Sequence, residues 1–439
     1  MAHPHTSDPP TPYAWYVLAM MFSVTALNVA DRNILQVLLQ PIKEEFQVSD
    51  TAMGLLVGTG FAVVHIFASL LIARWADRGV RRSIIAGGLL LWSGLTLISG
   101  LTRSYWQLLF ARVGVSAAEG AGSAPAHSLL CDYFPLDRRA RAMAIVGMGG
   151  IAGMGLGLAL GGTIAELYGW RSAFFVLGFP GILLAIAVRL SVREPERGRL
   201  DEGAAPVAAP SSRDALRFLL GRRSFVHMVL GAGYHAFAAM GAGAFNIAYL
   251  MRVHGMTIGE ASRIFVLVGP LLGAISAFAG GYLADALGRR DIRWYMWVPA
   301  ISAILALPFS VAFVLWPAES TFEFGGRVLP LALLVIVPAS LLGGMWNGPT
   351  LAMTQSIAPA SMRSFASALT TGTYNLIGMG LGPLAVGLIS DALHPRMGAD
   401  AIRYGLLIVG LTHLMGAAHH IVAARYLERD LEPSSPAEI

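Results

Sequence analysis

The sequence predicts an all-α membrane protein with twelve transmembrane helices in two pseudo-symmetric bundles of six. Of its 439 residues, 55% are hydrophobic and only 13% are charged, whereas soluble domains carry about 25% charged residues. Because each crossing of the hydrocarbon layer needs about 20 apolar residues, a chain of this length holds about twelve crossings with their loops. Motifs also recur at matching places in the two halves. These observations exclude a soluble enzyme and a single-span receptor.

Apolar segments bounded by charged residues or by Pro and Gly predict the individual helices in order. In the first half they cover residues 13–40, 51–77, 83–102, 104–132, 139–165 and 170–192. In the second half they cover residues 224–252, 258–286, 292–316, 327–356, 362–391 and 401–427.

Polar stretches set the predicted domain boundaries. A run rich in Pro, Ala and Ser predicts a cytoplasmic linker at 193–223 between bundles at 13–192 and 224–427. Residues 1–12 and 428–439 are expected to be cytoplasmic tails, because 21 basic residues then fall in cytoplasmic loops and eight in outside loops. We expect an integral protein of the inner (plasma) membrane.

One motif closes corresponding helices of the two halves. Residues 73–82 (ARWADRGVRR) end the second predicted helix, and residues 281–290 (GYLADALGRR) end the eighth. Pro125 of the fourth helix likewise has a counterpart in Pro349 of the tenth. Two bundles with the same motif and the same proline at matching positions predict a transporter whose bundles rock about a site between them.

This repeated element resembles the Gly-x-x-x-Asp-Arg/Lys-x-Gly-Arg-Arg signature of the major facilitator superfamily. The first copy departs from it, with Ala73 in place of Gly and Val80 between Gly79 and Arg81. The resemblance covers about residues 13–427. It implies the two-bundle fold of that superfamily and transport by alternating access.

Within the superfamily the sequence is similar to the spinster-like lipid transporters. The matching residues are Asn28, Asp31 and Arg32 in helix 1, Trp92, Ser93 and Thr96 in helix 3, Arg112, Gly114, Glu119 and Pro125 in helix 4, Asp132 at its end, and Arg193, Glu194, Pro195, Arg197 and Gly198 after helix 6. The anion-cation symporter family shares the charged residues of helices 1 and 4. Proton symport of an organic anion or sugar acid is therefore an alternative.

Four ionisable residues lie far from the ends of apolar helices, where a charge costs at least about 2.5 to 3.5 kcal/mol. Arg112 and Glu119 are two helical turns apart on one face, and Asp31 lies between them in estimated depth. We expect Glu119 or Asp31 to be the proton-coupling carboxylate, sharing Arg112 as its partner. The alternative is a static ion-pair cluster, which is favoured for Arg32 alone because it points about 100° away from Asp31.

Arg112 is also expected to bind an anionic substrate head, with Arg32 as a further substrate contact. The second bundle lacks central charges and offers aromatic and amide groups. Its expected substrate contacts are Phe245, Asn246, Trp346, Asn347, Thr370, Thr373 and Tyr374.

Charged residues at the cytoplasmic boundary are expected to form a gate that pairs in one state and separates in the other. They are Asp77, Arg78, Arg81, Arg82, Asp285, Arg289 and Arg290. The alternative is that they only anchor the topology.

Two further groups of residues have simpler interpretations. The glycines of helix 5 indicate close helix packing, and only weakly an antiporter motif. His65, His127, His235 and His413 are intramembrane histidines for which packing is the favoured role, and the neighbours His419 and His420 do not share a helical face. One cysteine, Cys131, excludes a thiolate cage. We therefore expect no metal site and no cofactor.

The sequence thus predicts a proton-coupled secondary transporter, not an enzyme, for an amphipathic, anionic or zwitterionic lipid-like substrate. Its expected partners are that substrate, protons and membrane lipids, with no nucleic acid, and the protein is expected to be a monomer. A multidrug/proton antiporter is a second alternative, and a receptor or scaffold that transports nothing is a third.

Overall fold

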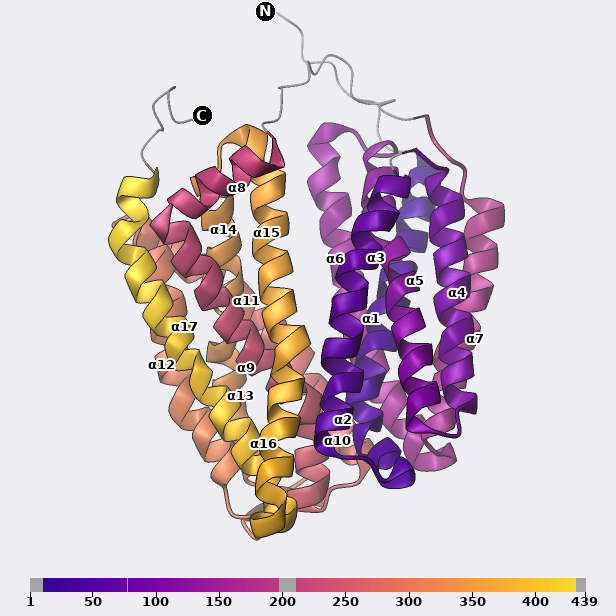
Figure 1. Ribbon diagram of the computed structural model, residues 1–439, viewed down its shortest axis with the longest axis vertical. Coiled ribbons are helices and arrows are strands. Elements are labelled where there is room, and N and C mark those ends of the chain that lie inside the picture. Colours follow the sequence, from indigo (N-terminus) through magenta and orange to yellow (C-terminus); the bar gives the residue numbers. More distant parts are fainter. Residues whose placement is uncertain (1–10, 77, 197–210, 432–439) are drawn as a thin grey trace, which may run out of the picture. The chain divides into compact units, whose positions relative to one another are not determined.

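The computed structural model describes residues 11–76, 78–196 and 211–431, which are almost entirely helical (Figure 1). The chain divides into two compact units. The first comprises residues Met1–Leu38 and Val63–Pro206, and the second comprises Leu39–Ala62 and Val207–Ile439. The segment 39–62, which the sequence analysis placed in the first bundle, therefore belongs to the second unit.

The first unit is a bundle of long helices. They are α1 (Pro12–Phe46), α3 (Gly60–Ala76), α4 (Arg81–Leu101), α5 (Tyr105–Cys131), α6 (Leu136–Tyr168) and α7 (Trp170–Ser191). The end of α1 and the start of α3 lie in the second unit. In this bundle α4 packs against both α5 and α7.

The second unit holds the remaining elements. They are α2 (Asp50–Gly54) with the π-helical turn η1 (Leu55–Thr59), α8 (Ser212–Gly221), α9 (Arg223–His254), α10 (Ile258–Val266), η2 (Leu267–Leu271), α11 (Leu272–Gly288), α12 (Trp294–Leu315), β1 (Thr321–Phe324), β2 (Arg327–Pro330), α13 (Ala332–Gly343), α14 (Asn347–Ile357), η3 (Ala360–Met362), α15 (Arg363–Asn375), η4 (Leu376–Leu381), α16 (Gly382–Met397), η5 (Gly398–Asp400) and α17 (Ala401–Leu431). Helix α9 packs along α17, and the two lie side by side in Figure 1.

Ten segments of the described residues are long and apolar enough to cross a membrane. The helix α5, which carries Arg112 and Glu119, is not one of them. One segment, Arg363–Leu431, is 69 residues long and contains α15, α16 and α17.

The predicted helix at 327–356 is interrupted in two places. Its first residues form a β-hairpin instead, in which Phe324 pairs with Arg327 across Gly325 and Gly326. Both glycines have positive φ, of 58° and 74°, a conformation that glycine adopts without steric cost. Helix α13 then begins at Ala332 and ends at Gly343, and α14 starts at Asn347 after a turn.

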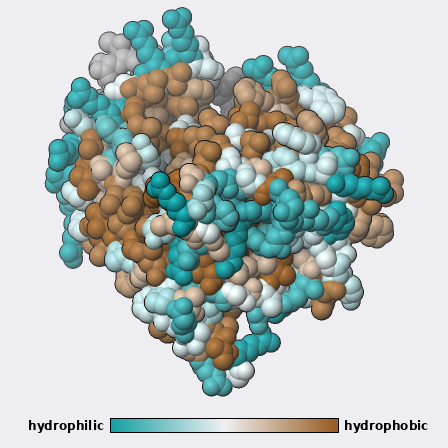
Figure 2. Space-filling view, turned by 60° about the horizontal axis from the view of Figure 1, so that its bottom comes forward, coloured by the Kyte–Doolittle hydropathy of each residue, from teal (hydrophilic) through white to brown (hydrophobic). Residues whose placement is uncertain are grey.

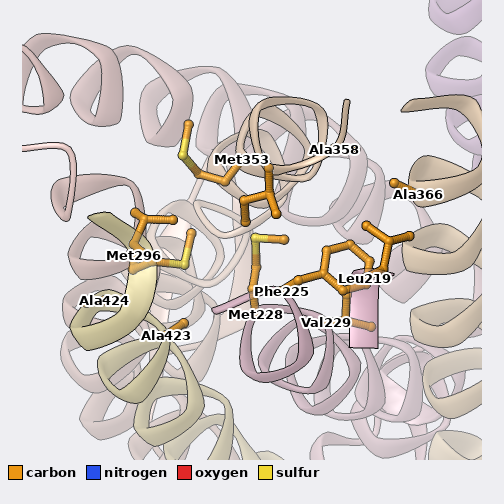
Figure 3. Close-up of a cluster of buried hydrophobic side chains, with 12 residues drawn as sticks. Leu219, Phe225, Met228, Val229, Met296, Met353, Ala358, Ala366, Ala423 and Ala424 are labelled. Atoms are coloured by element: carbon orange, nitrogen blue, oxygen red, sulfur yellow. The ribbon is translucent and has the colours of Figure 1, made fainter. Parts of the chain in front are cut away.

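The predicted linker contains a helix that belongs to the core of the second unit. Ser211 caps α8 by accepting a hydrogen bond from the amide of Asp214 at 3.2 Å. Leu219 of α8 is fully buried among Phe225 and Val229 of α9, as Figure 3 shows. Methionines of α12 and α14 and alanines of α15 and α17 also belong to this cluster.

Glycines of α6 let it lie directly on the backbone of α1. A Cβ atom at Gly149, Gly153 or Gly157 would come within 2.1 to 2.7 Å of carbonyl oxygens of α1. Their spacing of four residues places them on one face of α6. The packing interpretation of these glycines is confirmed, and the contact fixes the rotation of α1.

The outer faces of the helices carry large apolar side chains. Phe67, Phe110 and Phe278 are each at least 66% exposed, and Figure 2 shows hydrophobic side chains over much of the visible face. Soluble proteins rarely expose such extensive apolar surface. These faces are suited to contact with lipid.

Candidate functional site

Arg112 and Asp31 form a buried ion pair in the first unit. The Arg112 Nη1 donates to Asp31 Oδ1 at 3.0 Å, and its Nη2 donates to the main-chain oxygen of Asp31 at 3.0 Å. Thr96 of α4 donates to Asp31 Oδ2 at 2.6 Å. The Arg112 guanidinium also lies over the ring of Phe174, 5.8 Å from its centroid. Both oxygens of the Asp31 carboxylate therefore have a partner, and this pair ties α1, α4, α5 and α7 together.

Arg32 and Glu119 form a second ion pair in the same unit. Arg32 Nη2 donates to Glu119 Oε2 at 2.9 Å. The Glu119 side chain is fully buried, and the side chain of Arg32 is 30% exposed. Glu119 Oε1 is buried and has no hydrogen-bond partner among the residues that the structure describes. This oxygen is placed to accept a proton, because no donor occupies it.

The pairing differs from the expectation that Arg112 serves both acids. Arg112 and Glu119 are seven residues apart on α5, which separates them by about 10 Å along the helix. Asp31 and Arg32 point in different directions from α1, so Asp31 reaches Arg112 and Arg32 reaches Glu119. The cluster thus has two separate ion pairs, and Arg32 is a member of one of them.

The expected substrate contacts in the second unit differ in how far they are exposed. Phe245 and Thr370 have no exposed surface, and Trp346 and Asn246 are 8% exposed. Trp346 makes an edge-to-face contact with Tyr374, with 5.5 Å between ring centroids. The remaining three, Asn347, Thr373 and Tyr374, are partly exposed.

Arg81 is the centre of a buried network at one end of the first unit. Its Nε donates to Glu194 Oε1 at 2.8 Å, and its Nη1 donates to Asp132 Oδ2 at 2.5 Å. Glu194 also accepts from the amide of Arg82 at 2.8 Å. Burial raises the pKa of nearby Tyr133, whose hydroxyl donates to a main-chain oxygen at 2.7 Å. Arg81 therefore links the start of α4 to Asp132, which follows α5, and to Glu194, which follows α7.

The predicted gate residues do not all join such a network. Asp77 lies outside the described residues, and Arg78 is exposed. In the second copy of the motif, Asp285 accepts from the Tyr295 hydroxyl at 2.6 Å, and Arg289 and Arg290 are exposed. The two copies share a sequence pattern but differ in geometry among the described residues, because Arg81 pairs with the buried Asp132 and the partly buried Glu194 whereas Arg289 is exposed.

A second network was not expected from the sequence. Asp50 accepts two hydrogen bonds of 2.7 Å from the guanidinium of Arg252, one of 2.7 Å from Lys43 and one of 2.7 Å from Ser390. Asp391 caps α2 by accepting from the amides of Asp50 and Thr51 at 2.9 and 2.7 Å. The available signal was an acid at the start of an apolar segment, which is common at helix starts. These contacts explain why segment 39–62 belongs to the second unit.

A mostly helical membrane protein with ion pairs buried among its helices has the features expected of a secondary transporter. The family model of the Major Facilitator Superfamily matches residues 21–383. The chain belongs to this superfamily, and it is an integral membrane protein.

Known proteins that are similar to this chain include an efflux pump and spinster proteins. An MFS-type efflux pump of Mycolicibacterium smegmatis is 32% identical over 419 residues, covering 95% of this chain and 94% of the pump. Protein spinster homolog 1 of Xenopus laevis is 25% identical over 438 residues, covering 94% and 81% of the two chains. A crystal structure of a bacterial homolog of the human lysosomal transporter Spinster, inward-facing and unoccupied, is similar with a TM-score of 0.87. It is 28% identical and covers 98% of this chain and 100% of that one. The resemblance to spinster-like transporters is confirmed.

Proposed function

We propose that this protein is a proton-coupled secondary transporter that moves an amphipathic, anionic or zwitterionic lipid-like substrate by alternating access. The observation that carries the proposal is the Arg32–Glu119 pair. It joins a buried carboxylate with one unpartnered oxygen to a guanidinium that is partly exposed. Such a pair can exchange a proton for an anionic ligand.

The coupling step takes place at Glu119. When Glu119 is ionised, its charge holds Arg32 through the 2.9 Å hydrogen bond. When a proton binds the carboxylate, the ion pair is lost, and the guanidinium can turn to a phosphate or carboxylate head. Proton binding and substrate binding then favour the same state of Arg32, which couples the two.

Glu119 is a better coupling residue than Asp31. The Asp31 carboxylate is held by Arg112 and Thr96, one on each oxygen, so a proton there must displace an existing contact. We assign Asp31 and Arg112 to helix packing and Arg32 to the substrate head. Arg112 is 1% exposed, which argues against direct contact with a substrate.

In the second unit, Asn347, Thr373 and Tyr374 are the proposed substrate contacts with exposed surface. Trp346 supports Tyr374 through their ring contact. Phe245, Asn246 and Thr370 are then proposed to support these contact residues and not to touch the substrate. Aromatic and amide groups without charge suit the glycerol or hydrocarbon part of an amphiphile.

We further propose twelve crossings with both termini in the cytoplasm of the inner membrane. Adding α5 to the ten apolar segments and dividing Arg363–Leu431 at η5 gives this count. The basic residues of the loops support the orientation. A monomer is the proposed functional form.

Transport by purified protein in proteoliposomes tests the proposal. An imposed pH gradient should drive accumulation of a fluorescent lysophospholipid, and dissipating the gradient should abolish it. A single organic anion or sugar acid in place of the lipid tests the symporter alternative. Accumulation that ignores the gradient for all of these substrates would contradict proton coupling.

The relationship to the efflux pump favours one alternative, a multidrug/proton antiporter. Such a protein would also use a buried acid but would prefer cationic amphiphiles. Competition between ethidium and lysophosphatidic acid in the same vesicles separates the two functions. Dominant transport of the cation would replace the lipid proposal.

A further inference from the structure

Histidines of α9 and α17 meet inside the second unit. The Nδ1 atoms of His235 and His413 lie 2.9 Å apart, and the ring of His420 lies 5.2 Å from that of His235. A second pair, His227 and His419, joins the same two helices with 2.9 Å between Nδ1 atoms. Five imidazoles thus occupy one helix interface.

Glycines on the facing helix make room for these rings. A Cβ atom at Gly231 of α9 would lie 2.4 Å from the ring of His420, and one at Gly416 of α17 would lie 2.6 Å from the ring of His235. Each helix therefore offers a glycine to an imidazole of the other. The arrangement is reciprocal, and any larger residue at either glycine would displace a ring.

The hydrogen bonds define how these rings hold protons. His420 Nδ1 lies 2.9 Å from the main-chain oxygen of Gly416, which only accepts, so Nδ1 carries a proton. His420 Nε2 lies 3.4 Å from the Thr350 hydroxyl. Between His235 and His413 only one Nδ1 can carry the bridging proton.

One ring nitrogen of His235, Nε2, is buried without a hydrogen-bond partner among the described residues, and the side chain is 0% exposed. The ring stacks on Trp346, with 6.0 Å between centroids and 29° between planes. Burial opposes a charge at this place, and the indole face and the proton shared with His413 are the contacts that would offset it for an imidazolium.

The surroundings of the cluster are mostly apolar. Ala300 and Ala303 of α12 pack with Ala417 of α17. Gly378 of η4 lies against α9 at Ala236. Polar neighbours come from Thr350 of α14, from His419 and Tyr234, which stack at 5.5 Å, and from Tyr374 of α15 beyond Trp346.

Charged groups gather at one end of the two helices. Asp430 of α17 accepts from the amide of Ser224 at 2.8 Å, which caps α9. Arg223 and Arg429 both lie over the ring of Tyr426. His227, four residues into α9, is the imidazole nearest to this end, and His235 lies about 12 Å further along the helix.

We propose that His235, His413 and His420 form a proton-binding site in the second unit, separate from Glu119 of the first. One proton is shared between the two bonded imidazoles, and the His227–His419 pair lies on the route from the helix ends. In the described part of the chain no group of three or more His, Cys, Asp and Glu is placed to hold a metal ion. The proton is inferred from the hydrogen bond between His235 and His413 and from the unpartnered Nε2 of His235. As a part of the transport cycle the site rests on the proposed proton coupling, but its protonation can be measured without transport.

Tryptophan fluorescence of the purified protein tests the site, because an imidazolium stacked on an indole quenches its emission. Lowering the pH from about 8 to about 5 should quench the emission in wild type. Trp346→Phe and His235→Gln should each lose this component. His394→Gln, which alters a histidine at the end of α16, should retain it.

His413→Leu is the second variant, for the case that His235→Gln does not fold. Without the shared proton the midpoint of quenching should move to lower pH by about one unit. An unchanged midpoint, or quenching that survives in His235→Gln, would overturn the proposal. Glu119→Gln should titrate like wild type, so a failure of coupling at Glu119 and a failure of the histidine site give different results.

Discussion

Arg252 donates hydrogen bonds from Nη1 and Nη2 of its guanidinium to the two carboxylate oxygens of Asp50, each 2.7 Å long, although the two residues are 202 positions apart. Asp50 starts a helix of the first half of the sequence, and Arg252 lies near the end of α9 in the second half. The units of the fold are therefore not the halves of the sequence. The Asp50 carboxylate is 2% exposed and forms ion pairs with two cations, so it is held in one position.

Removing this carboxylate should destabilise the second unit. Asp50→Asn leaves Arg252 and Lys43, whose side chains are 11% and 22% exposed, without the buried carboxylate that they share. Breaking a buried ion pair costs about 3 kcal/mol or more. Asp400→Asn is the control, because the Asp400 side chain is 63% exposed and its pair with Arg403 contributes about 1 kcal/mol at most. The midpoint of thermal unfolding in detergent measures both. Equal midpoints for the two variants would contradict the role given to Asp50.

Glu119→Gln should abolish gradient-driven accumulation and leave substrate exchange intact. The amide cannot take up a proton, so the transporter retains binding but loses the coupling ion. Glu323→Gln, on the exposed strand β1, is the control. Flux with and without a pH gradient measures the difference. If Glu119→Gln still accumulates substrate against a gradient, the coupling group lies elsewhere.

Asp31→Asn should act mainly on stability. The substitution leaves Arg112 buried without its anion and weakens the contact with Thr96. We expect a loss of about 3 kcal/mol or more in the free energy of unfolding. Unfolding in SDS compared with wild type measures it. A stable Asp31→Asn protein with no gradient response would instead make Asp31 the coupling group.

Arg32→Lys should weaken binding of anionic amphiphiles, because Lys lacks the planar fork that binds a phosphate with two hydrogen bonds. The loss of one such bond to a charged group predicts about a tenfold rise in Kd. Neutral amphiphiles, which lack a phosphate or carboxylate, should bind nearly as before. Ligand binding in detergent checks this, and an unchanged Kd for the anionic ligand would remove Arg32 from the site.

The sequence predicted the fold class, the buried charges and the packing role of the glycines in α6. It could not predict which arginine pairs with which acid. A rise of 1.5 Å per residue gives the depth of Asp31 and Glu119, but the rotation of α1 depends on its contact with Gly153 of α6. The histidine pairs were missed for the same reason. His235 and His413 were visible as residues, but their register across two helices 178 positions apart leaves no local pattern.

Arg81→Ala should destabilise the first unit far more than Arg289→Ala. Both residues occupy the same place in the repeated motif, but Arg81 is 1% exposed and bonds two acids, whereas Arg289 is exposed. Loss of Arg81 removes the buried cation that Asp132 and Glu194 share, which predicts a cost of about 3 kcal/mol. Thermal unfolding compares the two. A similar loss of stability in both variants would show that the contacts of Arg81 with the two acids do not stabilise the first unit.

The contact between α6 and α1 gives the last prediction. Gly153→Ala would place a Cβ atom 2.1 Å from the main-chain oxygen of Ala26, so one helix must move. Gly147→Ala on the same helix meets nothing within 4 Å and should be neutral or stabilising by about 0.5 to 1 kcal/mol. Because α1 carries both Asp31 and Arg32, a shift of α1 should also disturb the two ion pairs.

Two measurements on this glycine pair separate packing from transport. Thermal unfolding should show a lower midpoint for Gly153→Ala and an equal or higher one for Gly147→Ala. Proton-driven transport at a temperature where both proteins are folded should be reduced only in Gly153→Ala, because its helix shift changes the distance between Arg32 and Glu119. Normal transport and normal stability of Gly153→Ala would mean that α6 does not set the position of α1.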